Sequence, residues 1–112
     1  MPVPDTVQAC VQACLRCAAT CDACAAACLD APGGHDMRRC IALDLDCAEA
    51  CRMAGALIAR ASEYSAEAAR FCARLCEGCA RECAEHPVAH CQACAQACRD
   101  CAQACASFAG AV

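Results

Sequence analysis

Cysteine is the residue type in this sequence with the greatest capacity for chemistry, and its spacing is regular. Eighteen of the 112 residues are Cys, about 16 %, whereas roughly 8–10 % already marks a short chain organised around sulfur. Within four segments, successive cysteines are three or four residues apart, except where Asp44 takes the place of a cysteine between Cys40 and Cys47. The eighteen are Cys10, Cys14, Cys17, Cys21, Cys24, Cys28, Cys40, Cys47, Cys51, Cys72, Cys76, Cys79, Cys83, Cys91, Cys94, Cys98, Cys101 and Cys105.

This spacing predicts that the thiols lie along one face of each helix, where they can bind metal. Side chains at i and i+4 have Cβ atoms roughly 5–6 Å apart, and two thiolates so placed reach one metal ion about 2.3 Å from each sulfur. Eight Cys-x-x-x-Cys pairs repeat along the chain. Packing alone would not favour Cys, because Leu would stabilise a core by roughly 1.5–3 kcal/mol at each position. Disulfides between helices remain an alternative, but in a reducing cytosol metal binding is the favoured interpretation.

The metal that best fits so many thiols is Cu(I). Soft thiolate ligands select Cu(I), Zn²⁺ or iron–sulfur clusters. One monovalent ion for each thiolate leaves the interior near neutral, whereas each Zn²⁺ bound by four thiolates leaves two negative charges buried. The ferredoxin motif C-x₂-C-x₂-C-x₃-C-P does not occur. A zinc or iron–sulfur protein and a thiol redox protein remain the alternatives, although redox C-x-x-C pairs usually take a βαβ setting.

Three other side chains are candidate ligands. Asp44 stands on the cysteine face of its helix, where a carboxylate either ligates metal or orients a ligand, since a plain buried acid would be costly. His86 and His90 lie between Cys83 and Cys91, and each is either a ligand where metal enters or a solvated residue.

Proline and glycine divide the chain into helix-length segments. We predict helices over residues 5–30, 36–60, 62–85 and 87–108, with Asp5 or Thr6 capping the first and Pro87 in the first turn of the last. Helices with such short connections indicate an all-α fold, an antiparallel four-helix bundle with a Cys-lined core, in a single domain spanning residues 1–112.

The antiparallel arrangement of the predicted helices gives the two ends of this bundle different residues. Soft and borderline ligands gather at one end, which we call the mouth, and apolar residues seal the other, the closed end. The residues expected at the mouth are Cys28, Cys40, Cys83, Cys91, His35, Met37, His86 and His90, and those expected at the closed end are Val7, Leu57, Ile58, Tyr64 and Phe108.

Charge and hydropathy exclude several kinds of partner. The net charge is −4, and the arginines form no basic cluster that would bind nucleic acid. No stretch approaches the roughly 18 apolar residues of a membrane span, and the start of the chain has neither the positive nor the apolar region of a signal peptide. We therefore expect a cytoplasmic protein whose partners include neither nucleic acid nor membrane.

A four-helix bundle lined by repeated Cys-x-x-x-Cys pairs resembles the bacterial copper storage proteins, and without a signal peptide it resembles their cytosolic branch. The resemblance covers about residues 5–108 and implies that all the cysteines bind multiple Cu(I) ions, with Asp44, His86 and His90 assisting. It also implies a homotetramer. The chain departs from the family in its shorter length and in having only Cys40, Cys47 and Cys51 on the second helix. The expected function is cytosolic, non-enzymatic storage of Cu(I), with a copper chaperone or a cytosolic thiol as partner.

Overall fold

The computed structural model describes residues 2–30 and 36–112. The chain forms helices α1 (Pro4–Leu29), α2 (Arg38–Ala59), α3 (Ser65–Ala84) and α4 (Ala89–Ala111). The predicted fold class, an all-α four-helix bundle with a cysteine-rich core, is confirmed. The helix limits lie within three residues of the predicted ones.

The start of α3 lies three residues after its predicted position, because the end of α2 occupies the residues before it. Ala61 has φ 55°, and the N–H groups of Ala61 and Ser62 bond to the carbonyls of Ile58 and Leu57 at 3.1 and 2.9 Å. This is the Schellman pattern, in which a residue after the helix adopts a left-handed conformation. The Ser65 hydroxyl then donates to the Leu57 carbonyl at 3.1 Å, so α3 begins at Ser65 rather than Ser62.

The predicted starts of α1 and α4 are wrong as well. Pro4, not Asp5 or Thr6, opens α1, with Val3 as N-cap and no side-chain cap. Pro87 lies outside α4, because Val88 is the N-cap with extended backbone, ψ 148°. The start of α1 follows from the fixed φ of Pro4 and its preference for extended backbone in the preceding residue, Val3.

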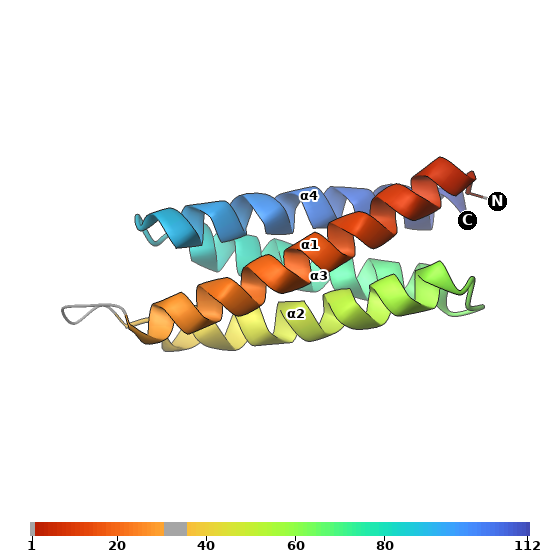
Figure 1. Cartoon of the computed structure of the whole chain (residues 1–112). Helices are drawn as coiled ribbons and strands as arrows, with labels where there is room; N and C mark the ends of the chain where they lie inside the picture. The colour runs from red at the N-terminus through yellow and green to blue at the C-terminus, as the bar shows by residue number, and fades with distance from the viewer. Residues whose placement is uncertain (1, 31–35) are drawn as a thin grey trace.

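The helices form a rod of 50 × 17 × 17 Å. In the described residues each helix packs against two neighbours, in the cyclic order α1, α2, α3, α4. Figure 1 shows the N- and C-termini at one end together with the connection from α2 to α3, whereas the connection from α3 to α4 lies at the other end. The second end is therefore the mouth, where α1 and α3 finish and α2 and α4 begin.

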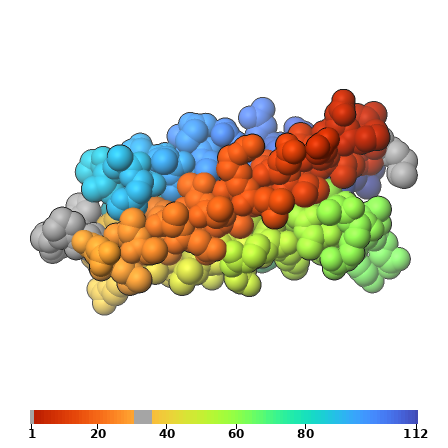
Figure 2. All heavy atoms as spheres, viewed as in Figure 1, coloured from red at the N-terminus to blue at the C-terminus, as the bar shows by residue number. Residues whose placement is uncertain are grey.

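Small residues flank the sulfur and let the helices approach closely. Ala48, Ala54, Ala69 and Ala95 are all fully buried. At Gly55 of α2, an added Cβ would lie 3.3 Å from Cβ of Cys14 in α1. Figure 2 shows the atoms of α1 filling the space between α2 and α4 on the viewed face. The helices therefore pack closely around the interior.

The closed end contains the larger apolar side chains. Ile58 and Phe108 are buried, with 2 % and 4 % of their surfaces exposed. Val7 and Leu57 pack partly buried against the core. Tyr64 does not belong to this seal, because it is 57 % exposed at the N-cap of α3. The sequence pattern misplaced it because the turn after α2 carries residue 64 outward.

Candidate metal centre

Sulfur atoms fill the interior between the mouth and the closed end. All eighteen cysteines are buried and none forms a disulfide. Thiols of different helices touch: Sγ of Cys47 in α2 lies 3.5 Å from Sγ of Cys76 in α3, and Sγ of Cys21 in α1 lies 3.6 Å from Sγ of Cys98 in α4. Neighbours along one helix touch as well, with 3.9 Å between the sulfurs of Cys17 and Cys21. The thiols thus form an array that extends both across and along the helices.

The spacing of the sulfurs suits a metal ion with little repacking. A metal about 2.3 Å from each thiolate sets neighbouring sulfurs about 3.8 Å apart in a tetrahedral site and about 4.0 Å apart in a trigonal one. Neighbouring sulfurs of the array stand at similar separations, such as 3.5 Å between Cys47 and Cys76 and 4.0 Å between Cys101 and Cys105. The fold alone therefore brings the thiols to the separations that metal binding requires.

Groups of four thiols share members, so metal ions bound in adjacent groups would share a bridging thiolate. In each group the four sulfurs lie within 4.8 Å of one another. Cys17 and Cys101 each belong to two of the groups given below, and so do Cys21 and Cys98. Such groups include Cys14, Cys72, Cys101 and Cys105; Cys17, Cys51, Cys76 and Cys101; Cys17, Cys21, Cys47 and Cys98; Cys21, Cys79, Cys94 and Cys98; and Cys24, Cys28, Cys40 and Cys91.

Asp44 places a carboxylate inside the thiol array. Its side chain is fully buried, and the thiols of Cys79 and Cys94 donate to its Oδ1 at 3.2 Å each. Cys83 donates to the same oxygen at 3.5 Å, and Cys40 lies 3.9 Å from Oδ2. Burial raises the pKa of Asp44 to about 7. The carboxylate therefore stands within reach of any metal that these thiols bind.

The pKa values of the thiols are shifted in different directions. Burial raises the pKa of Cys24 and Cys40 and raises the pKa of Cys91 to about 11. Hydrogen bonds from neighbouring thiols lower the pKa of Cys47 and Cys101, because S–H donors stabilise a thiolate. A metal that binds near Cys24, Cys40 and Cys91 must therefore displace protons.

The four mouth cysteines gather as the antiparallel threading predicts. Sγ of Cys28 lies 4.0 Å from Sγ of Cys40 and 3.8 Å from Sγ of Cys91. Sγ of Cys40 lies 3.6 Å from Sγ of Cys83. Met37, directly before α2, is buried at 4 % exposure. The sequence pattern thus located the mouth thiols correctly.

The two described histidines of the mouth face different groups. Nε2 of the half-buried His90 lies 3.4 Å from Sγ of Cys28, so this ring meets the thiol array. Nε2 of His86 lies 2.7 Å from Oε2 of Glu82. The third predicted residue, His35, lies outside the described residues. The structure therefore places His90 against a thiol of the mouth.

Sequence reasoning missed the partners of His86. The spacing of four residues between Glu82, in the last turn of α3, and His86, just after the helix, was a usable signal for their contact. The contact between Arg39 and Glu82 could not be predicted from sequence spacing, because the two residues are on different helices. Nε of Arg39 lies 3.1 Å from Oε1 of Glu82. Only the packing of α2 against α3 reveals that pair.

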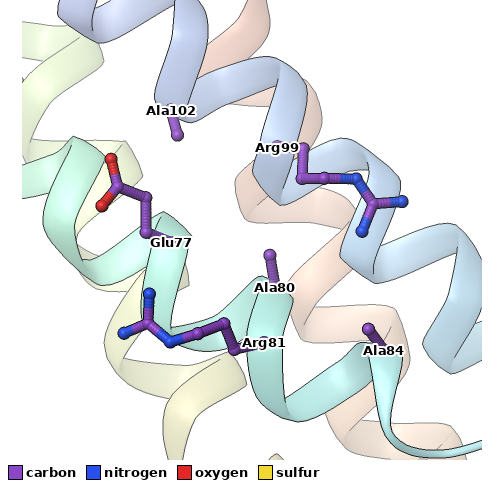
Figure 3. A pocket seen from close by; sticks show the side chains of 6 residues that line it. All are labelled: Glu77, Ala80, Arg81, Ala84, Arg99 and Ala102. Atoms are coloured by element: carbon purple, nitrogen blue, oxygen red, sulfur yellow. The ribbon is translucent and has the colours of Figure 1, made fainter.

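One hollow of the outer surface is separate from the thiols. It lies between α3 and α4 and is drawn in Figure 3. Its lining contains no cysteine and consists of Glu77, Ala80, Arg81, Ala84, Arg99 and Ala102. This hollow is open to solvent, and its guanidinium groups do not favour a cation. The metal-binding capacity therefore lies inside the bundle.

The fold and its interior define a class of protein: an all-helical bundle whose core is an array of thiols able to hold soft metal ions. A family model described as "Copper storage protein" (Csp) matches residues 3–110, and the chain belongs to this family. The family predicted from the cysteine pattern is thereby confirmed.

Solved structures of copper storage proteins superpose closely on the chain. The Cu(I)-bound copper storage protein BsCsp3 is 39 % identical, with a TM-score of 0.89, and the match covers 93 % of this chain and 98 % of that one. Csp3 from Bacillus subtilis without copper is also 39 % identical, with a TM-score of 0.85 over 91 % of this chain and 97 % of that one.

A cytosolic copper storage protein from Streptomyces lividans, with five coppers, is 38 % identical and has a TM-score of 0.91, over 96 % of this chain and 95 % of that one. The same organism's protein has also been solved loaded with 10 copper equivalents. Among curated proteins there is no match. None of the described helices is long and apolar enough to cross a membrane.

Proposed function

We propose that this chain is a non-catalytic store that sequesters many Cu(I) ions on the thiolates lining its core. The observation that supports this most strongly is the array of eighteen buried thiols, none of them in a disulfide, in which adjacent sulfurs stand at metal-bridging separations. Membership of the copper storage family supports it as well. Storage keeps Cu(I) away from redox chemistry and from the metal sites of other proteins.

Charge favours a monovalent ion as the cargo. Thiolates in a dry core are costly unless cations neutralise them. Cu(I) at about one ion for each thiolate leaves the interior near neutral, whereas Zn²⁺ in four-thiolate sites leaves an excess of negative charge. The relatives in the solved structures carry Cu(I) or multiple coppers, which agrees with this choice.

The proposed ligands are all eighteen cysteines together with Asp44 and the mouth histidines. Asp44 contributes its carboxylate oxygens between the mouth thiols and the inner thiols, since it contacts both Cys40 and Cys94. His90 receives copper at the mouth and passes it to Cys28, which its ring already touches. His86 assists entry at the same end.

We place this store in the cytosol, as its Streptomyces lividans relative is described, with a copper chaperone or a cytosolic thiol as the donor.

We also propose a homotetramer. Exposed Met53 and Phe71 line a hollow with Leu75 between α2 and α3, and a second copy of the chain would cover these apolar groups. Light scattering that gives the mass of a single chain would contradict the tetramer.

Anaerobic titration of the reduced protein with Cu(I), against a competing chelator, tests the storage function. We expect tight retention of well above nine ions for each chain, since bridging thiolates support roughly one ion each. Zn²⁺ in a parallel titration should bind in smaller number. Saturation at four or fewer Cu(I), a preference for Zn²⁺, or turnover of a thiol or Cu(II) substrate would contradict storage.

A further inference from the structure

Gly55 lies inside α2, one turn after Cys51, on the face that carries the thiols. It is buried, although glycine in a helix interior is less favourable than alanine. An added Cβ would lie 3.3 Å from Cβ of Cys14 in α1 and 4.0 Å from the carbonyl oxygen of Val11. The shorter distance is tighter than ordinary Cβ contacts, so glycine at position 55 lets α1 come closer to α2 than alanine would.

The other two glycines of the described helices make no such contact. An added Cβ at Gly78 of α3 would meet only the end of the Arg81 side chain, at 3.9 Å. One added at Gly110 of α4 would meet no atom within 4 Å. Replacing either glycine by alanine is therefore a matched control for the same replacement at Gly55.

The close approach at Gly55 lies beside sulfurs from three helices. Sγ of Cys14 in α1 lies 3.9 Å from Sγ of Cys101 in α4, and Sγ of Cys51 in α2 lies 3.8 Å from the same atom. Cys101 belongs to one group of four thiols that contains Cys14 and to another that contains Cys51. The distance between α1 and α2 at this level therefore determines how well thiolates of both helices can share metal ions with Cys101.

The separations of these sulfurs suit one soft monovalent ion better than another. A metal about 2.3 Å from each thiolate sets neighbouring sulfurs about 3.8 to 4.0 Å apart, as observed around Cys101. Ag(I) is also soft and monovalent, but it is larger and forms longer bonds to sulfur, so it requires wider separations. Because thiolates bind both ions well, selectivity between them depends on geometry.

We infer that Gly55 is a positioning residue for the inner copper ions: by letting α1 approach α2, it holds the thiols around Cys101 at separations that favour Cu(I) over the larger Ag(I). The inference rests on the proposed storage of Cu(I) and adds a residue that sets the selectivity of the store. A methyl group at position 55 would move its neighbours by a few tenths of an ångström, which widens the spacing of the thiols.

The spacing can be measured without metal. In high-resolution crystal structures of the metal-free protein, we expect the sulfurs of Cys14 and Cys101 to lie a few tenths of an ångström farther apart in Gly55→Ala than in the unmodified chain. Gly78→Ala should keep the unmodified separation of 3.9 Å. Unchanged sulfur positions in Gly55→Ala would overturn the inference. A Gly55→Ala chain that fails to fold would also overturn it, because the glycine would then serve packing alone.

Competition between the two ions tests the selectivity. Crystals loaded anaerobically with equal amounts of Cu(I) and Ag(I) give the occupancy of each metal by anomalous diffraction at energies that distinguish them. At positions bonded to Cys101, the ratio of Cu(I) to Ag(I) should fall roughly 10-fold in Gly55→Ala, as for loss of other groups that orient metal ligands. The ratio at mouth positions bonded to Cys28 should not change, and Gly78→Ala and Gly110→Ala should match the unmodified chain throughout.

The contrary results separate this inference from the storage function. An unchanged ratio at Cys101, or an equal change at Cys28, would overturn the inference and leave storage standing. An unmodified chain that binds no Cu(I), while Gly55→Ala still widens the thiol spacing of the metal-free protein, would contradict storage and leave the effect of Gly55 on that spacing intact.

Discussion

Replacing Cys17 by alanine should remove more copper capacity than replacing Cys10. Sγ of Cys17 lies 3.9 Å from the sulfurs of Cys21 and Cys47 and 3.8 Å from that of Cys98. Sγ of Cys10 lies 3.8 Å from that of Cys105, near the closed end of the array. Both side chains are buried, so the variants differ in how many metal positions they affect rather than in exposure.

The expected magnitude follows from the four-thiol groups. Cys17 belongs to at least two of them, and a metal about 2.3 Å from each sulfur in either group would lose one of its ligands. We therefore expect Cys17→Ala to bind about two fewer Cu(I) ions and Cys10→Ala about one fewer or none. Alanine is the better replacement because serine would introduce a hydroxyl that requires a partner in the dry core.

The assay is parallel anaerobic titration of both variants and the unmodified chain, with copper and protein quantified in the same samples. Circular dichroism of the metal-free forms checks that each variant is folded. Equal losses from the two variants, or an unchanged capacity in Cys17→Ala, would refute the view that shared thiolates form a continuous array.

Four further predictions concern stability and entry. Ala61→Gly should stabilise the metal-free chain by about 1 kcal/mol in urea unfolding, because Ala61 has φ 55° and the left-handed conformation costs residues with a Cβ roughly 1–2 kcal/mol. Phe108→Ala should destabilise it by about 3 kcal/mol through a cavity at the closed end while leaving Cu(I) capacity unchanged. Copper retention against a chelator should weaken as pH falls, because burial raises the pKa of Cys91 to about 11 and protons then compete with the metal for the thiol. The double variant His86→Ala/His90→Ala should slow Cu(I) loading in stopped flow with little loss of final capacity.

Each of these predictions has a contrary result. Ala61→Gly with unchanged or lower stability would mean that the flexibility gained by the unfolded chain outweighs the relief of strain. Loss of copper from Phe108→Ala would place metal in the closed end. Retention that is independent of pH would exclude proton displacement, and unchanged loading in the double histidine variant would remove the mouth histidines from entry.

The cysteine pattern was sufficient to predict most of the fold and of the thiol array. A spacing of three and four residues leaves one consistent arrangement, in which every thiol faces inward, and short connections require antiparallel neighbours. The same pattern correctly placed Asp44 in the interior, because residues on the cysteine face of α2 are buried.

Features that depend on turn geometry and on contacts between helices were not predictable in this way. The start of α3 moved to Ser65 because Ala61 takes a left-handed conformation that the sequence, lacking Gly there, did not indicate. The same turn leaves Tyr64 exposed. The contact of Arg39 with Glu82 depends on the rotation of α2 against α3, which periodicity alone does not fix.

The most direct test of the account is to locate copper in crystals of the loaded chain by anomalous diffraction at the copper edge. Storage on the thiol array predicts a row of copper positions inside the bundle, between the mouth group around Cys28 and the inner group around Cys105, each about 2.3 Å from two or more sulfurs. Copper confined to the mouth or to the outer surface, with the inner thiols free of metal, would contradict it.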